Sequence, residues 1–419
     1  MFGLSAEWLT HDGILIPTAI VLSHTEQRDR LAATVPAALS RVLIAGDLCF
    51  DQLSASLPLR ASYRRAYGLP ATRKLIVVSS TWAIPSLLGQ HPDLPLRLAE
   101  ALPADEFSIV VAPHPNIVAE HSRWQFREYL AAATRAGVQV IDDIDGWKSA
   151  IVAADLVVGD HGSVAFYAAA LGIAPLLAVE AGHTVDPASP ISGFLTAAPR
   201  LDPDDDLATQ VRAAITDHHA ARYTAATDLT TSYPMAGAAI LRTAMYAAMA
   251  LTEPPHAPEI PTAALPRTPI PGVDSHLVLV NSPRPGTATV TRYPAERLRS
   301  GRDLPRGAHL AVDVREPPHR WLRSADIMIG QPGPDTQTWI TDTLRALPGC
   351  RIATAPHRAD EWLLGTDSAV LSVLGPQDAC RLFASVAQHH LVRGAALPDL
   401  VGEWTIDCGG LTHRVSVRK

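Results

Sequence analysis

Three short polar turns in the first half of the chain have the residue types of a phosphate-binding site. They are SSTW at residues 79–82, HPN at 114–116 and DHGS at 160–163, and each directly follows an apolar stretch. Hydroxyl and imidazole groups donate hydrogen bonds to phosphate oxygens, and free N–H groups at the start of a helix favour an anion. Gathered in one crevice, such groups would stabilise a diphosphate without a metal ion.

The DHGS turn lies in the most informative stretch of the sequence, residues 155–175. The apolar run at 156–158 predicts a buried strand, and the Ala-rich segment at 164–171 predicts a helix that begins directly after the turn. Gly162 would allow close approach of a ligand to the backbone. The Ser163 hydroxyl would either cap the helix or reach a phosphate oxygen, and this stretch alone leaves both interpretations open.

Short apolar segments alternate with helical patterns on both sides of this turn. The expected strands are 75–80, 107–115, 138–142, 156–158 and 175–179. The expected helices are 93–102, 124–136, 146–154 and 164–171. This alternation predicts an α/β fold with a Rossmann-like parallel sheet that is covered on both faces. Because the carboxyl ends of parallel strands share one edge of a sheet, we expect the three turns to line one crevice.

Composition and periodicity divide the chain into four expected segments. Residues 1–45, with two strands around a polar helix, would be the remnant of a first Rossmann-type domain. Residues 46–251 carry the alternating pattern and the three turns. Residues 252–271 contain seven prolines and no periodicity, which favours a stiff, extended linker between domains. Residues 272–419 are predicted to form a smaller C-terminal α/β domain.

The pattern of this last domain predicts strands, two helices and a terminal hairpin. The expected strands are 276–280, 288–292, 309–314, 327–329 and 351–355. The expected helices are 336–347 and 377–391, and the hairpin covers 402–417 with its turn at Gly409-Gly410. We find no catalytic constellation in it and expect a packing or regulatory role.

Charge and composition exclude several classes of protein. The formal net charge is −7 and no block of Lys or Arg occurs, whereas binding to a nucleic-acid backbone needs a basic surface. No apolar run is long enough to cross a bilayer, and the first residues lack the basic flank and apolar core of a secretory signal. We therefore expect a cytoplasmic protein with no nucleic-acid partner and no transmembrane segment, and a homo-oligomer is one possible state.

Metal binding and disulfide formation are not expected. Four cysteines lie far apart without a CxxC pair, at positions 49, 350, 380 and 408. They are typical of buried thiols. The acidic residues Asp142, Asp143, Asp145 and Asp186 are typical of solvated turns, so we predict no metal site.

The order of the turns resembles the donor-binding half of CDP-glycerol glycerophosphotransferases, the GT-B-fold enzymes that polymerise teichoic acids. The matching segments are GDLCFDQL at 46–53, SSTW, HP at 114–115 and DHGS. The resemblance covers roughly residues 14 to 185 and implies a Rossmann-like domain of the GT-B C-terminal type. The chain also resembles a broad group of uncharacterised actinobacterial proteins that have the same DHGS turn.

The resemblance implies roles for residues of the turns. Gly162 and Ser163 would hold the donor diphosphate, Ser80 and Thr81 would line the same pocket, and His114 would neutralise charge on the departing phosphate. The alternative for His114 is a structural imidazole at a strand end.

Three further residues receive assignments, and two of them, Trp82 and Asp160, are open to two interpretations. Trp82 would stack on the nucleobase or simply pack in the fold. Asp160 would contact the donor or tie its own turn through its carboxylate. Glu180 follows the strand at 175–179, where related GT-B proteins place an acidic group on the ribose.

The sequence departs from the family pattern where positive charge is expected. Leu48 and Cys49 replace a Pro-Arg pair, and Ala83 replaces an Arg, although His161 would restore one charge. The family's catalytic base is a His-Gly pair in its first domain. His24 is the nearby candidate for this role, and the alternative is that it caps the helix that follows.

The resulting hypothesis is a GT-B-like transferase. It would move a glycosyl or polyol-phosphate group from a nucleotide-diphosphate donor, CDP-linked by the resemblance, to a hydroxyl acceptor, with no other cofactor. The alternatives are a non-catalytic nucleotide- or sugar-phosphate-binding module and a protein-interaction scaffold.

Overall fold

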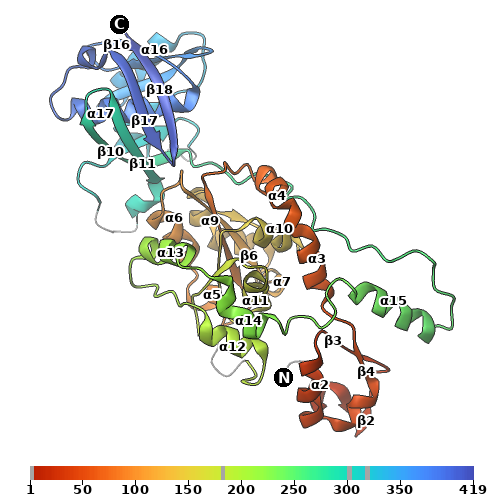
Figure 1. The fold of residues 1–419 in the computed structure, drawn as a ribbon. Helices are drawn as coiled ribbons and strands as arrows, with labels where there is room; N and C mark the ends of the chain where they lie inside the picture. Colours follow the sequence, from red (N-terminus) through yellow and green to blue (C-terminus); the bar gives the residue numbers. More distant parts are fainter. Residues whose placement is uncertain (1–3, 181–184, 300–303, 317–320) are drawn as a thin grey trace.

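The computed structural model describes residues 4–180, 185–299, 304–316 and 321–419. A five-stranded sheet with flanking helices lies at the centre, a nine-stranded barrel follows it in the sequence, and a small unit precedes it (Figure 1). The chain is thus an α/β protein, as predicted. Within the described part of the chain, the helices are all too short or too polar to cross a membrane.

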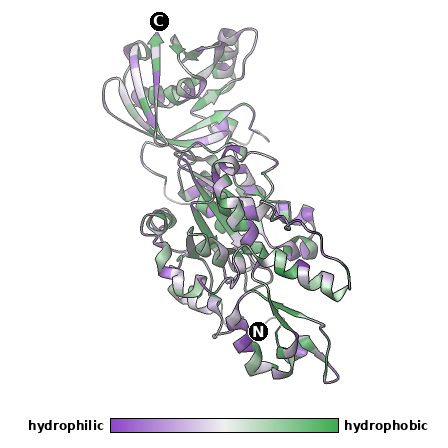
Figure 2. Ribbon diagram, turned by 45° about the vertical axis from the view of Figure 1, so that its right-hand side comes forward, coloured by the Kyte–Doolittle hydropathy of each residue, from purple (hydrophilic) through white to green (hydrophobic). Residues whose placement is uncertain are grey.

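The five strands of the central sheet are all parallel. Their order is β7 (Gln139–Val140), β6 (Phe107–Pro113), β5 (Lys74–Ser80), β8 (Leu156–Gly159) and β9 (Ala174–Leu177). These strands match the expected ones, so the prediction of a Rossmann-like parallel sheet is confirmed. Both faces are covered, which is why β5 and β8 each contain a continuous apolar run, at 75–78 and 156–158, rather than an alternating pattern. Figure 2 shows these hydrophobic strands enclosed by helices.

Helices pack on both faces of the sheet and form two separate cores. One core includes Tyr63 of α4 (Arg60–Ala66) and Ile151 of α10 (Gly146–Ala153). The other includes residues of helices α6 (Leu94–Ala101), α8 (Arg123–Tyr129), α9 (Ala131–Arg135) and α13 (Leu207–Thr216). The single helix predicted at 124–136 is divided into two helices, α8 and α9, which meet at Leu130.

The strand order reverses at β5. From β5 the chain passes to β6 and β7 on one side, and it then returns to form β8 and β9 on the other side. A crevice forms outside the carboxyl ends of the strands at such a reversal, and ligands of open α/β sheets bind there. The SSTW turn follows β5 and the DHGS turn follows β8, so both lie at this position.

The N-terminal unit is built around two parallel strands, β3 (Ile20–Leu22) and β4 (Val42–Ile44). The polar helix expected between two strands in this unit is α2 (Thr25–Thr34), and it ends two residues before Pro36, which lacks the N–H that a continuing helix needs. That this unit is the remnant of a first Rossmann-type domain stays a prediction.

Two consecutive helices between the N-terminal unit and the central sheet were not anticipated from the sequence. The GDLCFDQL segment begins α3 (Leu48–Ser56), which is followed closely by α4. Asp47 caps α3 by accepting a hydrogen bond from the Phe50 amide at 2.9 Å. The later helix α15 (Gly237–Ala248) does match a helical pattern of the sequence, at residues 236–251. It projects away from the central sheet (Figure 1), and only Gly237 of it is buried.

The proline-rich segment is anchored along its second half. The Tyr63 hydroxyl donates to the Ala263 carbonyl at 2.8 Å, and the Ala263 amide donates to Ser56 Oγ at 2.9 Å. The Ile270 amide donates to the Tyr67 carbonyl at 3.0 Å. This part of the linker is therefore a strap on the helices that cover the sheet, rather than a free spacer.

The C-terminal unit combines strands with helices, as expected for a small α/β domain, but its sheet is a closed barrel, which was not predicted. Its strand order is β10 (Ser275–Arg284), β11 (Thr287–Pro294), β17 (Gly402–Cys408), β18 (Leu411–Arg418), β16 (Val370–Leu374), β15 (Glu361–Gly365), β14 (Ile352–Arg358), β13 (Ile327–Ile329) and β12 (His309–Asp313). The strands β15 and β16 were missed, and they join β14 to β18 and so close the sheet. The expected helices are α16 (Thr336–Ala346) and α17 (Gln377–Leu391).

Candidate functional site

The SSTW and HPN turns contact each other at the carboxyl edge of the sheet. The His114 amide donates to the Ser80 carbonyl at 3.0 Å. The Trp82 ring packs on the His114 ring with a centroid distance of 4.3 Å and an interplanar angle of 36°. This contact follows from the pairing of β5 with β6, which places residue 80 beside residue 113.

The Asp160 carboxylate joins the SSTW turn to the DHGS turn. The side chain is 2% exposed. Its Oδ2 accepts from the Thr81 amide at 2.7 Å, the Thr81 hydroxyl at 2.8 Å and the Leu87 amide at 3.0 Å. Its Oδ1 accepts from the Gly162 amide at 3.0 Å. All three turns therefore lie together. The buried Asp160 carboxylate is hydrogen-bonded to donors of the protein itself.

Gly162 is required by the close approach of these two turns. A Cβ atom at this position would lie 2.7 Å from Thr81 Cγ2 and 3.1 Å from Asp160 Oδ1. Ser80, in contrast, is satisfied internally, because its hydroxyl donates to the Thr81 carbonyl at 2.9 Å and accepts from the Leu88 amide at 3.0 Å. The Ser80 hydroxyl thus stabilises the conformation of the SSTW turn.

Ser163 is the first residue of α11 (Ser163–Ala170), with Gly162 at the cap position. The Ser163 side chain is exposed and its hydroxyl has no hydrogen-bond partner in the described part of the chain. The first amides of a helix lack partners within the helix, and they carry the positive end of its dipole. This hydroxyl and the amides beside it are therefore available to an anion.

The His114 ring has one nitrogen engaged and one available. Its Nδ1 accepts from the Asn116 amide at 3.1 Å and so caps α7 (Pro115–His121). Burial lowers the pKa of His114, although the charge of Asp160 opposes this. The neutral ring with Nδ1 as acceptor carries its proton on Nε2, so His114 is a hydrogen-bond donor at neutral pH.

The remaining predicted residues are His161, Glu180 and His24, and their contacts connect them less clearly to the site. His161 lies within the DHGS turn, and its buried Nδ1 has no hydrogen-bond partner in the described ranges. Glu180 is exposed and lies three residues beyond the end of β9. His24 caps α2, with Nδ1 accepting from the Glu26 amide at 3.1 Å. No hydrogen bond or ring contact between described residues joins Glu180 or His24 to the three turns, and their roles stay predictions.

The side chains of the GDLCFDQL segment bond to α11 and to residues at the start of α15. The Tyr167 hydroxyl of α11 donates to Asp47 Oδ2 at 2.8 Å. Asp51, which is 2% exposed, accepts from the amides of Met235 at 2.7 Å and Gly237 at 3.3 Å. This segment thus holds α11 and the segment before α15 together.

An apolar cavity beside the SSTW turn was not anticipated from the sequence. It has a volume of about 630 Å³ and is lined by Ala83, Ile84, Ile117, Phe126 and Tyr129, among others. Ala83 has a φ of +64°, a conformation that is uncommon for residues other than glycine. The apolar residue Ile84, two positions after Trp82, is the sequence signal that could have indicated this cavity, and its side chain is exposed.

No group of three or more His, Cys, Asp or Glu side chains is arranged to hold a metal ion within the described ranges.

No protein-family model matches this chain, and no curated protein matches its sequence. Several solved structures resemble it over slightly more than half of its length. The wall teichoic acid polymerase TagF aligns with 56% of this chain and 58% of its own, with 15% identity and a TM-score of 0.41. This chain thus spans less than two thirds of that polymerase.

Two other similar structures are a UDP-GlcNAc 2-epimerase from Neisseria meningitidis and a glycosyltransferase from Rickettsia africae. The epimerase aligns with 55% of this chain and 61% of its own, with 14% identity and a TM-score of 0.34. The glycosyltransferase aligns with 55% and 62%, with 11% identity and a TM-score of 0.31. Likenesses at this level identify neither a substrate nor a reaction.

Proposed function

We propose that the carboxyl edge of the five-stranded sheet binds the diphosphate of a nucleotide-linked donor, CDP-linked by the sequence resemblance. The observation that carries this proposal is the position of Asp160. Its carboxylate fixes the SSTW and DHGS turns where the strand order reverses, while the Ser163 hydroxyl, the first amides of α11 and His114 Nε2 are left for a ligand.

The chemistry proposed for this site is transfer of a glycosyl or polyol-phosphate group to a hydroxyl acceptor. The acceptor oxygen would form a bond to the donor carbon or phosphorus as the bond to the nucleotide breaks, and the acceptor proton would pass to solvent or a base. His114 would donate a hydrogen bond from Nε2 to the departing phosphate and so stabilise its charge. Because Nδ1 caps α7 and Nε2 carries the proton, His114 acts here as a donor rather than as the base.

A second candidate is a module that binds the same nucleotide without turnover. The absence of the family's arginines favours it, because Leu48, Cys49 and Ala83 bring no charge to an anionic donor. Burial raises the pKa of the Cys49 thiol, so this side chain is neutral as well. In this case, the donor groups of the turns would hold the nucleotide, and no acceptor would be activated.

Calorimetric titration with CDP, UDP and CDP-glycerol tests the proposal. We expect CDP-linked ligands to bind, and Ser163→Ala and His114→Ala each to weaken binding about tenfold, the effect of one hydrogen bond to a charged group. Ser368→Ala in an exposed barrel turn and His256→Ala in the linker are matched controls that should leave affinity unchanged.

Release of the nucleotide from a bound CDP-linked donor separates the two candidates. Release that depends on an added polyol or sugar acceptor supports the transferase, and binding without release supports the non-catalytic module. If none of the nucleotides binds at millimolar concentration, or if both site variants bind as the unmodified chain does, the proposed site is wrong and an interaction scaffold is favoured.

A further inference from the structure

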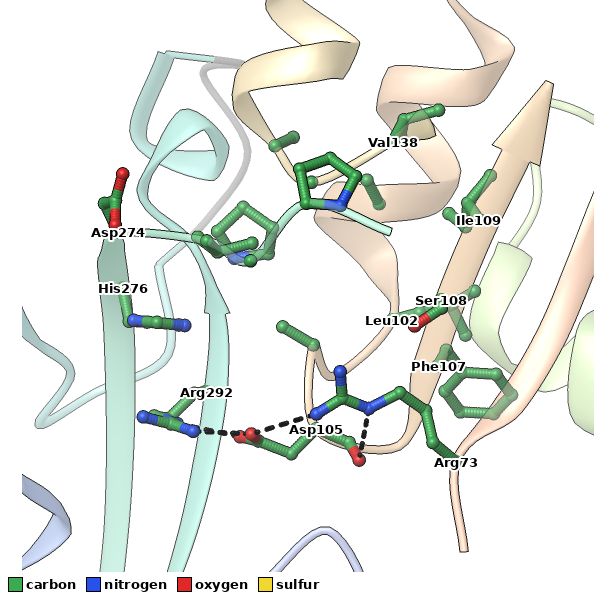
Figure 3. Close-up of a pocket in the computed structure, with 18 of the residues that line it drawn as sticks. Arg73, Leu102, Asp105, Phe107, Ser108, Ile109, Val138, Asp274, His276 and Arg292 are labelled. Atoms are coloured by element: carbon green, nitrogen blue, oxygen red, sulfur yellow. Dashed lines mark hydrogen bonds and ion pairs between the residues drawn. The ribbon is translucent and has the colours of Figure 1, made fainter. Parts of the chain in front are cut away.

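A polar cavity lies between the central sheet and the barrel, separate from the three turns. Its volume is about 540 Å³, within the range of small-molecule pockets, which occur preferentially at junctions between folded units. Phe107 and Ser108 at the start of β6 line one side. His276 of β10 and Arg292 of β11 extend into it from the barrel, opposite Arg73 (Figure 3).

One carboxylate at the floor of this cavity is shared by two guanidinium groups. Asp105 accepts from Arg292 Nε at 2.8 Å and from Arg292 Nη2 at 2.5 Å. Arg73 Nη2 lies 3.8 Å from the same carboxylate, and Arg73 Nε donates to the Asp105 backbone carbonyl at 3.3 Å. The Nη1 groups of both arginines have no hydrogen-bond partner among the described residues.

A second buried carboxylate is shared in the same way on the barrel side. Asp313, at the end of β12, is fully buried and pairs with Arg315 at 3.0 Å and with Arg381 of α17. Gln331 also donates to it at 3.2 Å. Arg381 uses only Nη2 in this pair, so its Nη1 and Nε are without partners within the described part of the chain.

The polar groups that line the cavity and have no hydrogen-bond partner among the described residues are mainly donors. Arg73, Arg292 and Arg381 each retain free guanidinium N–H groups. Asp378, in the first turn of α17, is exposed and forms no hydrogen bond or close ion pair with a described residue, although its charge acts on Arg73 and Arg292. Burial, with the nearby charge of Arg292, lowers the pKa of His276 to about 3, so this ring adds no charge at neutral pH. An oxyanion is the ligand that matches converging guanidinium donors.

We propose that this cavity binds a small molecule that carries a phosphate or carboxylate group, with Arg73, Arg292 and Arg381 as its hydrogen-bond donors. The site is independent of the function proposed for the three turns. A ligand there would contact both the sheet unit and the barrel, and it would therefore stabilise the junction between them.

Calorimetry with inorganic phosphate and, separately, with succinate tests this site and distinguishes the two oxyanions. Arg73→Gln removes a guanidinium that has only weak contacts of its own, and we expect it to weaken binding about tenfold. Asp378→Asn removes a like charge beside the ligand, and we expect binding about threefold tighter. Arg345→Gln, exposed on α16 and paired with Asp342, is the control and should bind as the unmodified chain does.

The two variants shift affinity in opposite directions, so loss of folding in one cannot imitate the result. Phosphate bound at the start of α11 would respond to Ser163→Ala and to neither cavity variant, which separates this site from the proposed donor site. Failure of both oxyanions to bind at millimolar concentration would overturn the proposal. So would binding that neither Arg73→Gln nor Asp378→Asn changes.

Discussion

Asp160 accepts hydrogen bonds from both the backbone amide and the hydroxyl of Thr81, a residue 79 positions earlier in the chain. The same carboxylate also receives the amides of Leu87 and Gly162. One buried anion thus sets the relative position of the turns that follow β5 and β8. The geometry of the proposed donor site depends on this single side chain.

We predict that Asp160→Asn destabilises the protein by about 2–3 kcal/mol and weakens nucleotide binding. The amide would direct an NH2 group at donors that now meet a charged oxygen, so at least one charge-assisted hydrogen bond is lost in a buried position. Urea unfolding measures the free energy, and titration with CDP measures binding. Asp145→Asn, at a largely exposed side chain, is the control. Equal stability of the two variants would contradict a central role for Asp160.

A second prediction concerns the junction between the sheet and the barrel. Asp105 is 13% exposed in its side chain and holds Arg292 with two hydrogen bonds. Burial acts to raise the pKa of Asp105, but the hydrogen bonds and charge of Arg292 outweigh it and hold the pKa far below its usual range. Breaking such a buried pair costs about 3 kcal/mol, so Asp105→Asn should lower stability by this amount at pH 7.

The sign of the pH dependence follows from this depressed pKa. The contribution of Asp105 is present above the pKa of the unfolded state, near 3.8, and is lost as the pH falls below that value. Asp105→Asn should therefore show less loss of stability in acid than the unmodified chain, as measured by thermal unfolding from pH 6 to pH 2. Asp342→Asn, at an exposed surface pair, should leave the acid dependence unchanged.

The central sheet could be predicted from sequence because its signals are local. Each strand is a short apolar run, and each is followed by a helical pattern, so the parallel order and the shared edge follow from general rules. The meeting of the SSTW, HPN and DHGS turns follows from the same reasoning. The hydrogen bond from the Gly162 amide to Asp160 is the tie within its own turn that the sequence allowed. The three bonds from Thr81 and Leu87 could not be predicted, because they depend on the position of a distant segment.

The closure of the barrel was missed for a physical reason. The strands β15 and β16 are five residues each, and they are joined by a short turn without the Asn-Gly or Asp-Gly pair that marks many hairpins. Closure is a long-range property that no local pattern encodes. The cavity at the junction was missed likewise, since Asp105, Arg292 and Asp313 are far apart in the sequence and carry no shared motif.

A third prediction concerns the strap formed by the proline-rich segment. Tyr63 is fully buried, and its hydroxyl donates to the Ala263 carbonyl. Tyr63→Phe leaves this buried carbonyl without its donor, at a cost of about 1–2 kcal/mol. We expect faster proteolysis within residues 252–271, measured by limited digestion and mass spectrometry. Tyr246→Phe on the projecting helix α15 is the control, and equal cleavage of the two variants would show that the strap is held by other contacts.

A fourth prediction concerns His309, which begins β12 and is 6% exposed. Burial, with a smaller effect of His389, lowers the pKa of His309 to about 4. Its Nε2 has no partner within the described ranges. Between the unfolded pKa of 6.5 and the folded pKa, the unfolded chain binds more protons, so stability falls as the pH falls through this window.

The expected loss from His309 alone is about 3 kcal/mol between pH 7 and pH 4. His309→Gln removes the titrating group while it keeps a polar side chain of similar size, so the variant should lose correspondingly less stability over this range. Urea unfolding at each pH measures the slope. His256→Gln, at an exposed linker position, should keep the slope of the unmodified chain. Parallel slopes for all three proteins would mean that the His309 ring takes up a proton in the folded state as readily as in the unfolded one.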